Sequence, residues 1–182
     1  MRIVGGQFRG RRFTPPAKTP ARPTTDIAKE GLFNTLTNMI DLEGIKTCDL
    51  FGGTGSISYE LASRGAADLT LIEQDRGNIT FIQRTVKELG IADQFNIIKG
   101  EVFRFMKQST EQYDFIFAGP PYALQNIDDI AILVFEHNML APGGIFVLEH
   151  TPRNDYQQHE RFLKMKNYGT TVFSYFTQPN DE

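Results

Sequence analysis

The sequence predicts an α/β protein with a doubly wound, mostly parallel sheet of seven strands and helices on both faces. From residue 45 onward, short apolar runs alternate with segments of helical periodicity. A glycine-rich turn follows the first run, and the most apolar run ends at consecutive prolines. Strands that alternate with helices pair in parallel through right-handed crossovers. The last apolar segments have no helix between them, so they predict an antiparallel hairpin at the sheet edge.

The opening segment of the chain precedes this alternation. Residues 2–13 contain short apolar stretches separated by glycines, and they predict a short irregular hairpin. Residues 14–24 carry four prolines and predict an extended linker. A helix should then begin after Thr24 or Thr25 as N-cap, because Asp26 follows and apolar residues recur at helical spacing. We expect this helix to pack one face on the rest of the protein.

Within the alternating region, each strand and helix has its own pattern. Strands are short apolar runs, and they are expected at residues 47–51, 68–72, 95–99, 113–118 and 145–149. Helices follow the strands, and they are expected at residues 56–64, 76–89, 102–107 and 128–137. A turn is expected at residues 141–144, where a proline and two glycines occur together. The terminal hairpin is expected at residues 162–167 and 170–177.

Positive charge is concentrated at the N-terminus. The 182-residue chain has a net charge of −3, with 40% hydrophobic and 23% charged residues, which is typical of one globular domain. Residues 1–25 hold six basic residues and no acidic one, which leaves 13 basic against 22 acidic residues elsewhere. We therefore divide the chain into a basic hairpin and linker, residues 1–25, and a globular domain, residues 26–182. Such a block is commonly a solvated arm, but it also fits a clamp for nucleic-acid phosphates.

Several classes of protein and site are disfavoured. Cys48 is the only cysteine, so it is interpreted as a core residue, with a catalytic nucleophile as the less favoured alternative. His137, His150 and His159 lack metal-ligand spacing, so no metal is expected and solvated or capping roles are predicted. The apolar uncharged run at residues 115–127 is too short to span a bilayer, and no signal-peptide pattern begins the chain. We expect a cytoplasmic protein without a membrane partner.

A glycine turn follows the first predicted strand, in the sequence DLFGGTG at residues 49–55. Glycines let the backbone pass close to a ligand and adopt dihedral angles that side chains disfavour. In a doubly wound sheet, ligands bind beyond the carboxyl ends of the strands, where the strand order reverses. A dinucleotide fingerprint would need a further glycine at the position of Ser58. An NAD-linked oxidoreductase is therefore disfavoured but stays open.

Acidic residues follow the next two predicted strands. Glu73 is placed to accept hydrogen bonds from the ribose hydroxyls of an adenosine-type cofactor, or else to cap the following helix. Glu101 is placed to accept a hydrogen bond from an adenine amino group, or else to supply negative charge to a helix N-terminus. Both alternatives stay open for each residue.

The fourth predicted strand ends in the loop Gly119-Pro120-Pro121-Tyr122. Two consecutive prolines can neither continue a central strand nor enter a helix interior, so the loop must be rigid. With an aromatic ring as its wall, the loop can form a small pocket at the mouth of the strand. An ordinary exit from the strand is the alternative.

These features resemble one known class of enzyme. The pattern is similar to that of class I S-adenosylmethionine-dependent methyltransferases. It combines an acid and a glycine turn at the first strand, acids after the second and third strands, and the Pro-Pro-Tyr loop. The match narrows through the segments RIVGG (residues 2–6), RGR (9–11), RPTTD (22–26) and SRGA (63–66). With these segments the chain resembles the bacterial small-subunit ribosomal RNA guanine-N2 methyltransferase family (RsmD-like). The resemblance runs over nearly the whole chain and implies a Rossmann-like methyltransferase fold.

The resemblance implies methyl transfer from S-adenosylmethionine to the exocyclic N2 amine of a guanine in small-subunit (16S) ribosomal RNA. The substrate would be free RNA or an assembling 30S particle, and a monomer is expected. The implied cofactor-binding residues are Thr24, Asp26, Asp49, Gly52, Gly53, Gly55, Glu73 and Glu101. The implied catalytic residues are Gly119, Pro120, Pro121 and Tyr122, with the tyrosine ring stacked on the extruded base. The implied RNA-binding residues are Arg2, Arg9, Arg11, Arg12 and Arg22.

One residue departs from the family pattern, which has aspartate where this chain has Gly119. The change keeps the backbone carbonyl at Pro120 and the ring of Tyr122 but removes a side-chain acceptor for the reacting amine. If nothing replaces that acceptor, the rate should fall roughly 10²- to 10³-fold. Three interpretations stay open: a slow methyltransferase using water or another carboxylate, a catalytically silent RNA-binding or ribosome-assembly protein, and a single-residue variant of an ordinary enzyme. Methylation of a DNA adenine amine is a further alternative, disfavoured by the small size of the chain.

Overall fold

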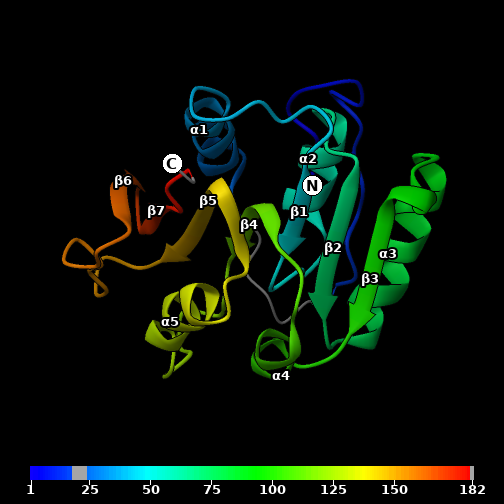
Figure 1. Ribbon diagram of the computed structural model, residues 1–182. Coiled ribbons are helices and arrows are strands. Elements are labelled where there is room, and N and C mark those ends of the chain that lie inside the picture. Colours follow the sequence, from blue (N-terminus) through cyan, green and yellow to red (C-terminus); the bar gives the residue numbers. More distant parts are fainter. Residues whose placement is uncertain (18–23, 181–182) are drawn as a thin grey trace.

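The computed structural model describes residues 1–17 and 24–180, whose strands form a seven-stranded sheet (Figure 1). The strands are β1 Lys46–Asp49, β2 Asp68–Glu73, β3 Phe95–Lys99, β4 Tyr113–Ala118, β5 Leu140–His150, β6 Phe162–Tyr168 and β7 Thr171–Thr177. Their order across the sheet is β3-β2-β1-β4-β5-β7-β6. Strands β1 to β5 pair in parallel, whereas β7 pairs antiparallel with β5 and β6. The predicted doubly wound sheet and terminal hairpin are confirmed, and the order reverses between β1 and β4.

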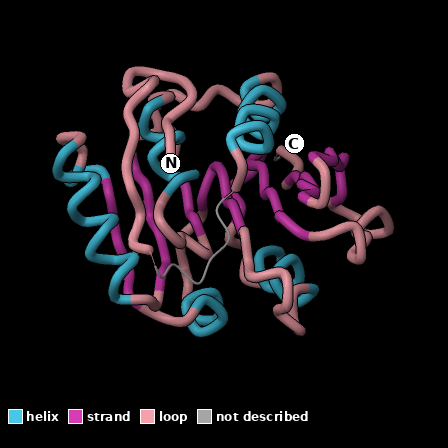
Figure 2. Tube along the Cα trace, turned by 180° about the vertical axis from the view of Figure 1, so that it is seen from behind, coloured by secondary structure: helices cyan, strands magenta, loops and turns pink. Residues whose placement is uncertain are grey.

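Helices cover both faces of this sheet. They are α1 Asp26–Thr37, α2 Ser56–Ser63, α3 Arg76–Glu88, α4 Val102–Gln108 and α5 Asp128–Glu136. Helices α1, α2 and α3 share one apolar cluster with Phe115 and Phe117 of β4, and α4 and α5 share another with Ile116 and Ala118 of the same strand. Figures 1 and 2 show α1 and α2 on one side of the sheet and α4 and α5 on the other. Because successive strand residues point to opposite faces, the apolar run of β4 serves both layers.

Helix α1 begins where the sequence predicts. Thr25 is its N-cap, and the Thr25 hydroxyl accepts a hydrogen bond from the backbone N–H of Ala28 at 3.2 Å. The apolar residues Met39 and Ile40 lie beyond the end of the helix at Thr37. A short 3₁₀ helix, η1 Ala92–Gln94, precedes β3 and was not predicted.

The turn expected at residues 141–144 is wrong, because this segment lies inside β5. The pairing of β5 with β4 shifts register before Ile145, so the segment bulges out of the ladder. This irregularity accommodates Pro142, which has no N–H to donate, and Gly143, whose φ is 76°. The proline and glycines therefore mark a bulge within a strand rather than its beginning.

His150 is a second correction, because it is neither solvated nor a helix cap. The side chain is buried, with Nε2 2.7 Å from Ser174 Oγ and Nδ1 2.7 Å from the Thr151 carbonyl oxygen. Burial lowers the pKa of His150, which favours the neutral imidazole. Since Ser174 lies on β7, the ring joins the two antiparallel strands at this end of the sheet.

The basic N-terminal segment packs on α2. An antiparallel bridge between Arg2 and Arg12 forms the predicted hairpin. The backbone N–H groups of Val4 and Gly5 donate to the two carboxylate oxygens of Glu60 at 2.8 and 2.9 Å. The basic N-terminal segment is thus hydrogen-bonded to α2, the helix that follows the glycine turn.

A buried ion pair extends this attachment to α1. Lys29 of α1 is 1% exposed and Glu60 of α2 is 0% exposed, with 3.6 Å between Lys29 Nζ and Glu60 Oε1. Lys29 Nζ also donates to the carbonyl of Arg2 and to Ser56 Oγ, and Arg64 Nε donates to Glu60 at 3.0 Å. Burial lowers the pKa of Lys29, and the Glu60 carboxylate opposes that shift. Because an unpaired buried charge is costly, each partner is needed by the other.

Removing the carboxylate of Glu60 should destabilise the fold by about 3–5 kcal/mol, because Glu60→Ala leaves the Lys29 ammonium buried without its partner. Urea unfolding followed by circular dichroism measures the change. The double variant Lys29→Met/Glu60→Gln should recover part of the loss, because it removes the buried ammonium together with its carboxylate partner.

The matched control is Glu88→Ala, which truncates an exposed glutamate at the end of α3. This control should change the free energy of unfolding by less than about 0.5 kcal/mol. Equal unfolding midpoints for Glu60→Ala and Glu88→Ala would contradict the anchoring role of the buried pair.

Candidate active site

Two adjoining cavities open at the carboxyl ends of the parallel strands. The first cavity, about 310 Å³, lies between the N-terminal linker and the glycine turn. The second cavity, about 520 Å³, lies between the ends of β2 and β3 and the Pro-Pro-Tyr loop. Four residues line both of them, namely Phe51, Gly53, Gly119 and Glu149. The two cavities therefore meet at the point where the strand order reverses, the usual place for a ligand in such sheets.

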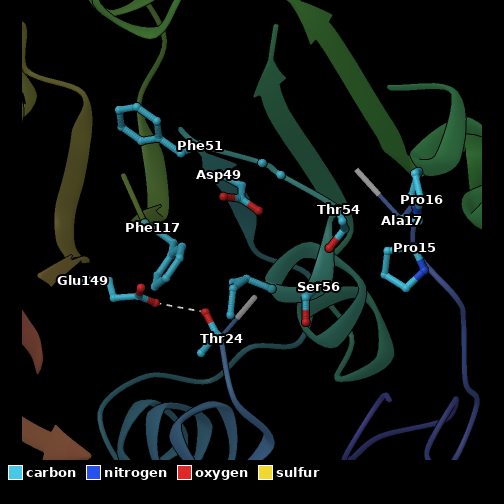
Figure 3. Close-up of a pocket in the computed structure, with 14 residues that line it drawn as sticks. Pro15, Pro16, Ala17, Thr24, Asp49, Phe51, Thr54, Ser56, Phe117 and Glu149 are labelled. Atoms are coloured by element: carbon cyan, nitrogen blue, oxygen red, sulfur yellow. Dashed lines mark hydrogen bonds between the residues drawn. The ribbon is translucent and has the colours of Figure 1, made fainter. Parts of the chain in front are cut away.

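Figure 3 shows the first cavity from within. Pro15, Pro16 and Ala17 of the linker lie on the side opposite Glu149, and the Asp49 carboxylate lies between the two sides. Linker residues thus complete a site whose floor belongs to the sheet. The linker prolines, expected only to extend the chain, also line a cavity.

Close packing requires glycine at two positions of the glycine turn. A Cβ on Gly52 would lie 2.4 Å from the Leu71 side chain of the neighbouring strand β2. Gly55, the N-cap of α2, has a φ of 88°, and a Cβ there would lie 2.5 Å from the ring of Tyr59. Gly53 then lies exposed to both cavities. The turn brings backbone, rather than side chains, to the site.

Asp49 is a buried carboxylate that faces the first cavity. It is 2% exposed, and its Oδ2 accepts a hydrogen bond from Ser58 Oγ at 2.9 Å. Its Oδ1 has no hydrogen-bond partner among the described residues. Burial raises the pKa of Asp49 to about 7; the hydrogen bond from Ser58 opposes this shift, and the Glu73 and Glu149 carboxylates add to it. A cation or hydrogen-bond donor in the cavity would satisfy this oxygen.

Glu73 ends β2 and is held by Asn78, a residue that the sequence did not indicate. Asn78 Nδ2 donates to Glu73 Oε2 at 2.7 Å, and the backbone N–H of Gln74 donates to Oε1 at 2.9 Å. Both Glu73 and Asn78 line the second cavity. The alternative role of capping the next helix belongs to Asp75 instead. A carboxylate fixed at this strand end suits a ribose diol.

Glu101 serves as the N-cap of α4. Its carboxylate accepts hydrogen bonds from the backbone N–H groups of Phe103 at 2.9 Å and Arg104 at 2.8 Å. It also lines the second cavity beside Val102. The helix-terminus role that the sequence left open is therefore observed, and the carboxylate lies beside the cavity as well.

The Pro-Pro-Tyr loop forms a wall of the second cavity through residues 120–122. Gly119 lies where the two cavities meet. A Cβ added there would lie 3.0 Å from Phe117 Cε1 and 3.8 Å from Glu149 Oε1. A side chain at this position thus needs a small movement of the Phe117 ring, and it would be directed toward the neighbourhood of Glu149.

Glu149 of β5 is the functional candidate that sequence reasoning missed. It is 6% exposed; its Oε1 accepts a hydrogen bond from Thr24 Oγ1 at 2.9 Å (Figure 3), and its Oε2 accepts one from the Tyr122 hydroxyl at 3.0 Å. The Tyr122 hydroxyl also lies 3.1 Å from Thr171 Oγ1. A charged residue inside the apolar run of β5 was the only signal in the sequence. Its approach to Gly119 depends on the pairing of β5 with β4.

Thr24 and Asp26 have different surroundings. Thr24 lines the first cavity, as expected. Asp26 does not line either cavity in the described part of the chain, and instead pairs with Arg2 at 3.2 Å. Both side chains of this pair are partly exposed, so the pair contributes little to stability. It ties the start of α1 to the N-terminal hairpin.

Three of the predicted RNA-binding arginines are exposed on the N-terminal hairpin, namely Arg9, Arg11 and Arg12. The guanidinium of Arg11 lies 5.8 Å from the centre of the Phe13 ring, a cation–π arrangement. Arg2 is engaged with Asp26, and Arg22 lies outside the described residues.

Two further features of the described residues concern other kinds of site. Within residues 1–17 and 24–180, no three His, Cys, Asp or Glu side chains are grouped so as to hold a metal ion, and no helix is long and apolar enough to cross a membrane. Cys48 is buried on β1, and burial raises the pKa of its thiol well above the ordinary value. The prediction that Cys48 is a core residue is confirmed.

Comparison with known proteins decides the family. The family described as "Conserved hypothetical protein 95" matches residues 1–177. The chain belongs to this family. A curated relative, "Ribosomal RNA small subunit methyltransferase D" of Escherichia coli (strain K12), is 31% identical over 156 residues, which cover 85% of this chain and 76% of the relative. The resemblance predicted from the sequence motifs is confirmed.

Solved structures agree with this family assignment. The structure named "Putative methyltransferase yhhF from Escherichia coli" has a TM-score of 0.86 and 26% identity, and the match covers 100% of this chain and 99% of the other. An RNA methyltransferase from Salinibacter ruber in complex with S-adenosyl-L-homocysteine has a TM-score of 0.67 at 18% identity, covering 88% of this chain and 96% of the other. The second likeness shows the fold alone.

S-adenosylmethionine, the cofactor predicted from the family resemblance, fits the residues of the two cavities. The unpartnered Oδ1 of Asp49 can accept a hydrogen bond from an ammonium group in the first cavity. Gly52, which has no room for a side chain, lines the same cavity with backbone atoms. Glu73, fixed by Asn78, offers acceptors to a ribose in the second cavity. The shared opening joins these two parts into one site.

The affinity for S-adenosylmethionine should rise with pH between about 5.5 and 7.5. The pKa of Asp49 in the free protein is raised to about 7, and a cationic ligand favours the ionised carboxylate. Below that pKa, the affinity should gain up to about tenfold per pH unit. Isothermal titration calorimetry measures this dependence. Asp49→Asn should bind more weakly and lose the dependence; an unchanged pH profile in this variant would contradict the assignment.

Proposed function

We propose that the protein transfers a methyl group from S-adenosylmethionine to the exocyclic N2 amine of a guanine in small-subunit (16S) ribosomal RNA. The observation that carries the proposal is the meeting of the two cavities at Gly119 and Glu149, beside a rigid Pro-Pro-Tyr wall. The printed name of the Escherichia coli relative supports ribosomal RNA as the substrate class. A relative of the same name from Haemophilus influenzae is 29% identical over 178 residues.

In this proposal the cofactor lies across both cavities. Asp49, Gly52 and Gly53 contact its amino-acid part, and Thr24 lines the same side. Gly55 lines neither cavity, and it supports the site through the positive φ that shapes the turn. Glu73 binds the ribose hydroxyls, and Glu101 lies at the adenine end. When bound, S-adenosylmethionine supplies an electrophilic methyl group on a sulfonium that departs as a neutral thioether.

The Pro-Pro-Tyr loop holds the target base. The exocyclic amine of guanine is a poor nucleophile, because its lone pair is delocalised into the ring. Transfer requires the nitrogen in line with the methyl group and its hydrogens directed at acceptors. The backbone carbonyl of Pro120 is one acceptor, and the ring of Tyr122 stacks on the base once it has left the RNA stack. The hydrogen bond from Tyr122 to Glu149 orients that ring.

The N-terminal hairpin binds the RNA backbone. Arg9, Arg11 and Arg12 are exposed on it, and Arg11 packs over Phe13. Guanidinium groups form paired hydrogen bonds to phosphate oxygens. The hairpin leads directly into Pro15, Pro16 and Ala17, which line the first cavity, and this continuity supports RNA binding on that side of the protein. We propose that the protein acts as a monomer in the cytoplasm, on free RNA or an assembling 30S particle.

A second candidate function is a catalytically silent RNA-binding or ribosome-assembly protein of the same fold. Its specific support is Gly119, which provides no side chain where the family motif has a carboxylate. The glycine turn, Asp49 and the exposed arginines would still bind cofactor and RNA. This alternative predicts salt-sensitive RNA binding without turnover.

The purified protein should transfer labelled methyl from S-adenosylmethionine to undermodified small-subunit RNA or 30S particles. Nuclease digestion and mass spectrometry should identify N2-methylguanosine as the product. Asp49→Asn should lower the rate at low cofactor concentration through weaker binding. A different methylated nucleoside would contradict the guanine-N2 assignment. Absence of transfer by both the native chain and Gly119→Asp would contradict methyltransferase activity and favour the silent protein.

The triple variant Arg9→Ala/Arg11→Ala/Arg12→Ala should bind RNA at least tenfold more weakly near 100 mM salt, as a rough expectation for three lost phosphate contacts. The slope of log affinity against log salt should fall by about 2. Filter binding over a salt series measures both. The control replaces three exposed lysines away from the hairpin, Lys87, Lys107 and Lys166. Equal losses in the two triple variants would contradict a hairpin-specific contact.

A further inference from the structure

Methyl transfer to a guanine amine produces a proton that needs an acceptor. As the nitrogen bonds to the methyl carbon, it gains positive charge and must lose one of its hydrogens. A carboxylate within hydrogen-bonding distance would align the amine before transfer and take the proton afterwards. At position 119 the chain offers only glycine for this task.

One carboxylate stands out by its position. Glu149 is the only acidic side chain that lines both cavities within the described residues. Asp49 lines the first cavity alone, and Glu73 and Glu101 line the second alone. A base on the Pro-Pro-Tyr wall and a methyl group presented from the cofactor site would meet where the two cavities join. Glu149 is therefore the carboxylate at the meeting point.

The distance to Gly119 strengthens this assignment. A Cβ added at Gly119 would lie 3.8 Å from Glu149 Oε1. A carboxylate carried by residue 119 and the carboxylate carried by Glu149 would therefore occupy neighbouring positions. Although Gly119 has no side chain, the carboxylate of Glu149 lies beside its backbone.

Two hydroxyl groups hold Glu149 in this position. Thr24 Oγ1 donates to Oε1 at 2.9 Å, and the Tyr122 hydroxyl donates to Oε2 at 3.0 Å. Each carboxylate oxygen thus accepts a hydrogen bond from a different part of the chain, and the two hydrogen bonds orient the group. One donor comes from the linker that lines the cofactor side, and the other from the ring proposed to stack on the base. Glu149 is thus fixed to both halves of the site.

We propose that Glu149 is the catalytic carboxylate of this protein, in place of the acidic side chain absent at Gly119. The inference rests on the proposed function. The N2 lone pair attacks the methyl carbon, and the C–N bond forms as the C–S bond breaks, with its electron pair left on sulfur. The positively charged nitrogen then gives one proton to the Glu149 carboxylate. The resulting carboxylic acid releases that proton to solvent, which restores the carboxylate.

The test compares Glu149→Gln with the native chain in methylation of undermodified small-subunit RNA. The amide keeps the size of the side chain but cannot take the proton. We expect kcat to fall by about 10²- to 10³-fold, by analogy with loss of one preorganised polar group. The dissociation constant for S-adenosylhomocysteine, measured by calorimetry, should change by less than about threefold if only the acceptor is lost. The matched control is Glu136→Gln on the exposed end of α5, which should keep native kcat. A kcat for Glu149→Gln within threefold of the control would overturn the proposal.

A second variant keeps the proposal testable if Glu149→Gln fails to fold. Gly119→Asp in the native background adds a second carboxylate next to Glu149, and it should not raise kcat because an acceptor is already present. An increase in kcat of tenfold or more would show that the native chain lacks a proton acceptor, and it would overturn the role of Glu149. Formation of N2-methylguanosine in that case would still support the proposed function. Absence of N2-methylguanosine with both the native chain and Gly119→Asp would overturn the proposed function and the role of Glu149 together.

Discussion

The buried ion pair between Lys29 and Glu60 joins the parts of the protein that must be held in register. Glu60 receives the backbone of Val4 and Gly5, and Lys29 binds the carbonyl of Arg2. The pair therefore connects the N-terminal hairpin, α1 and α2 without contacting either cavity. Isolated surface contacts such as the one between Arg2 and Asp26 could not do this, because solvent screens them. A buried pair is demanding in geometry, and here that demand fixes the N-terminal hairpin against α1 and α2.

The first cavity is lined by a buried carboxylate that lowers the stability of the fold. Burial raises the pKa of Asp49 to about 7, well above that of an unperturbed aspartate, so burying its charge opposes folding at and above neutral pH. The sign follows from the raised pKa: between the unfolded and folded values, stability falls as the pH rises. Ser58 satisfies one carboxylate oxygen and leaves the other toward the cavity. A hydrogen-bond donor on a ligand would satisfy that oxygen, so this carboxylate is arranged to bind a ligand.

The geometry of the parallel sheet explains why distant residues meet at one point. Strands β1, β4 and β5 are neighbours that run in the same direction, so their carboxyl ends share an edge. Gly119 leaves the end of β4, and Glu149 lies near the end of β5 beside it. Thr24, far away in the sequence, reaches the same carboxylate from the linker. Glu149 is therefore bonded both to the linker, through Thr24, and to the Pro-Pro-Tyr loop, through Tyr122.

Local patterns determined the sheet, its helices, the N-cap of α1 and the glycine turn, because periodicity and capping are properties of neighbouring residues. They also marked Asp49, Glu73 and the Pro-Pro-Tyr loop, which are strand-end positions. The tertiary structure alone decided that Pro142 lies in a bulge and that His150 is buried, because both depend on a neighbouring strand. It also decided that Asn78 holds Glu73 and that Asp26 binds Arg2 rather than lining a cavity. Above all, the sequence showed that Gly119 lacks a carboxylate, whereas only strand pairing could bring Glu149 beside it.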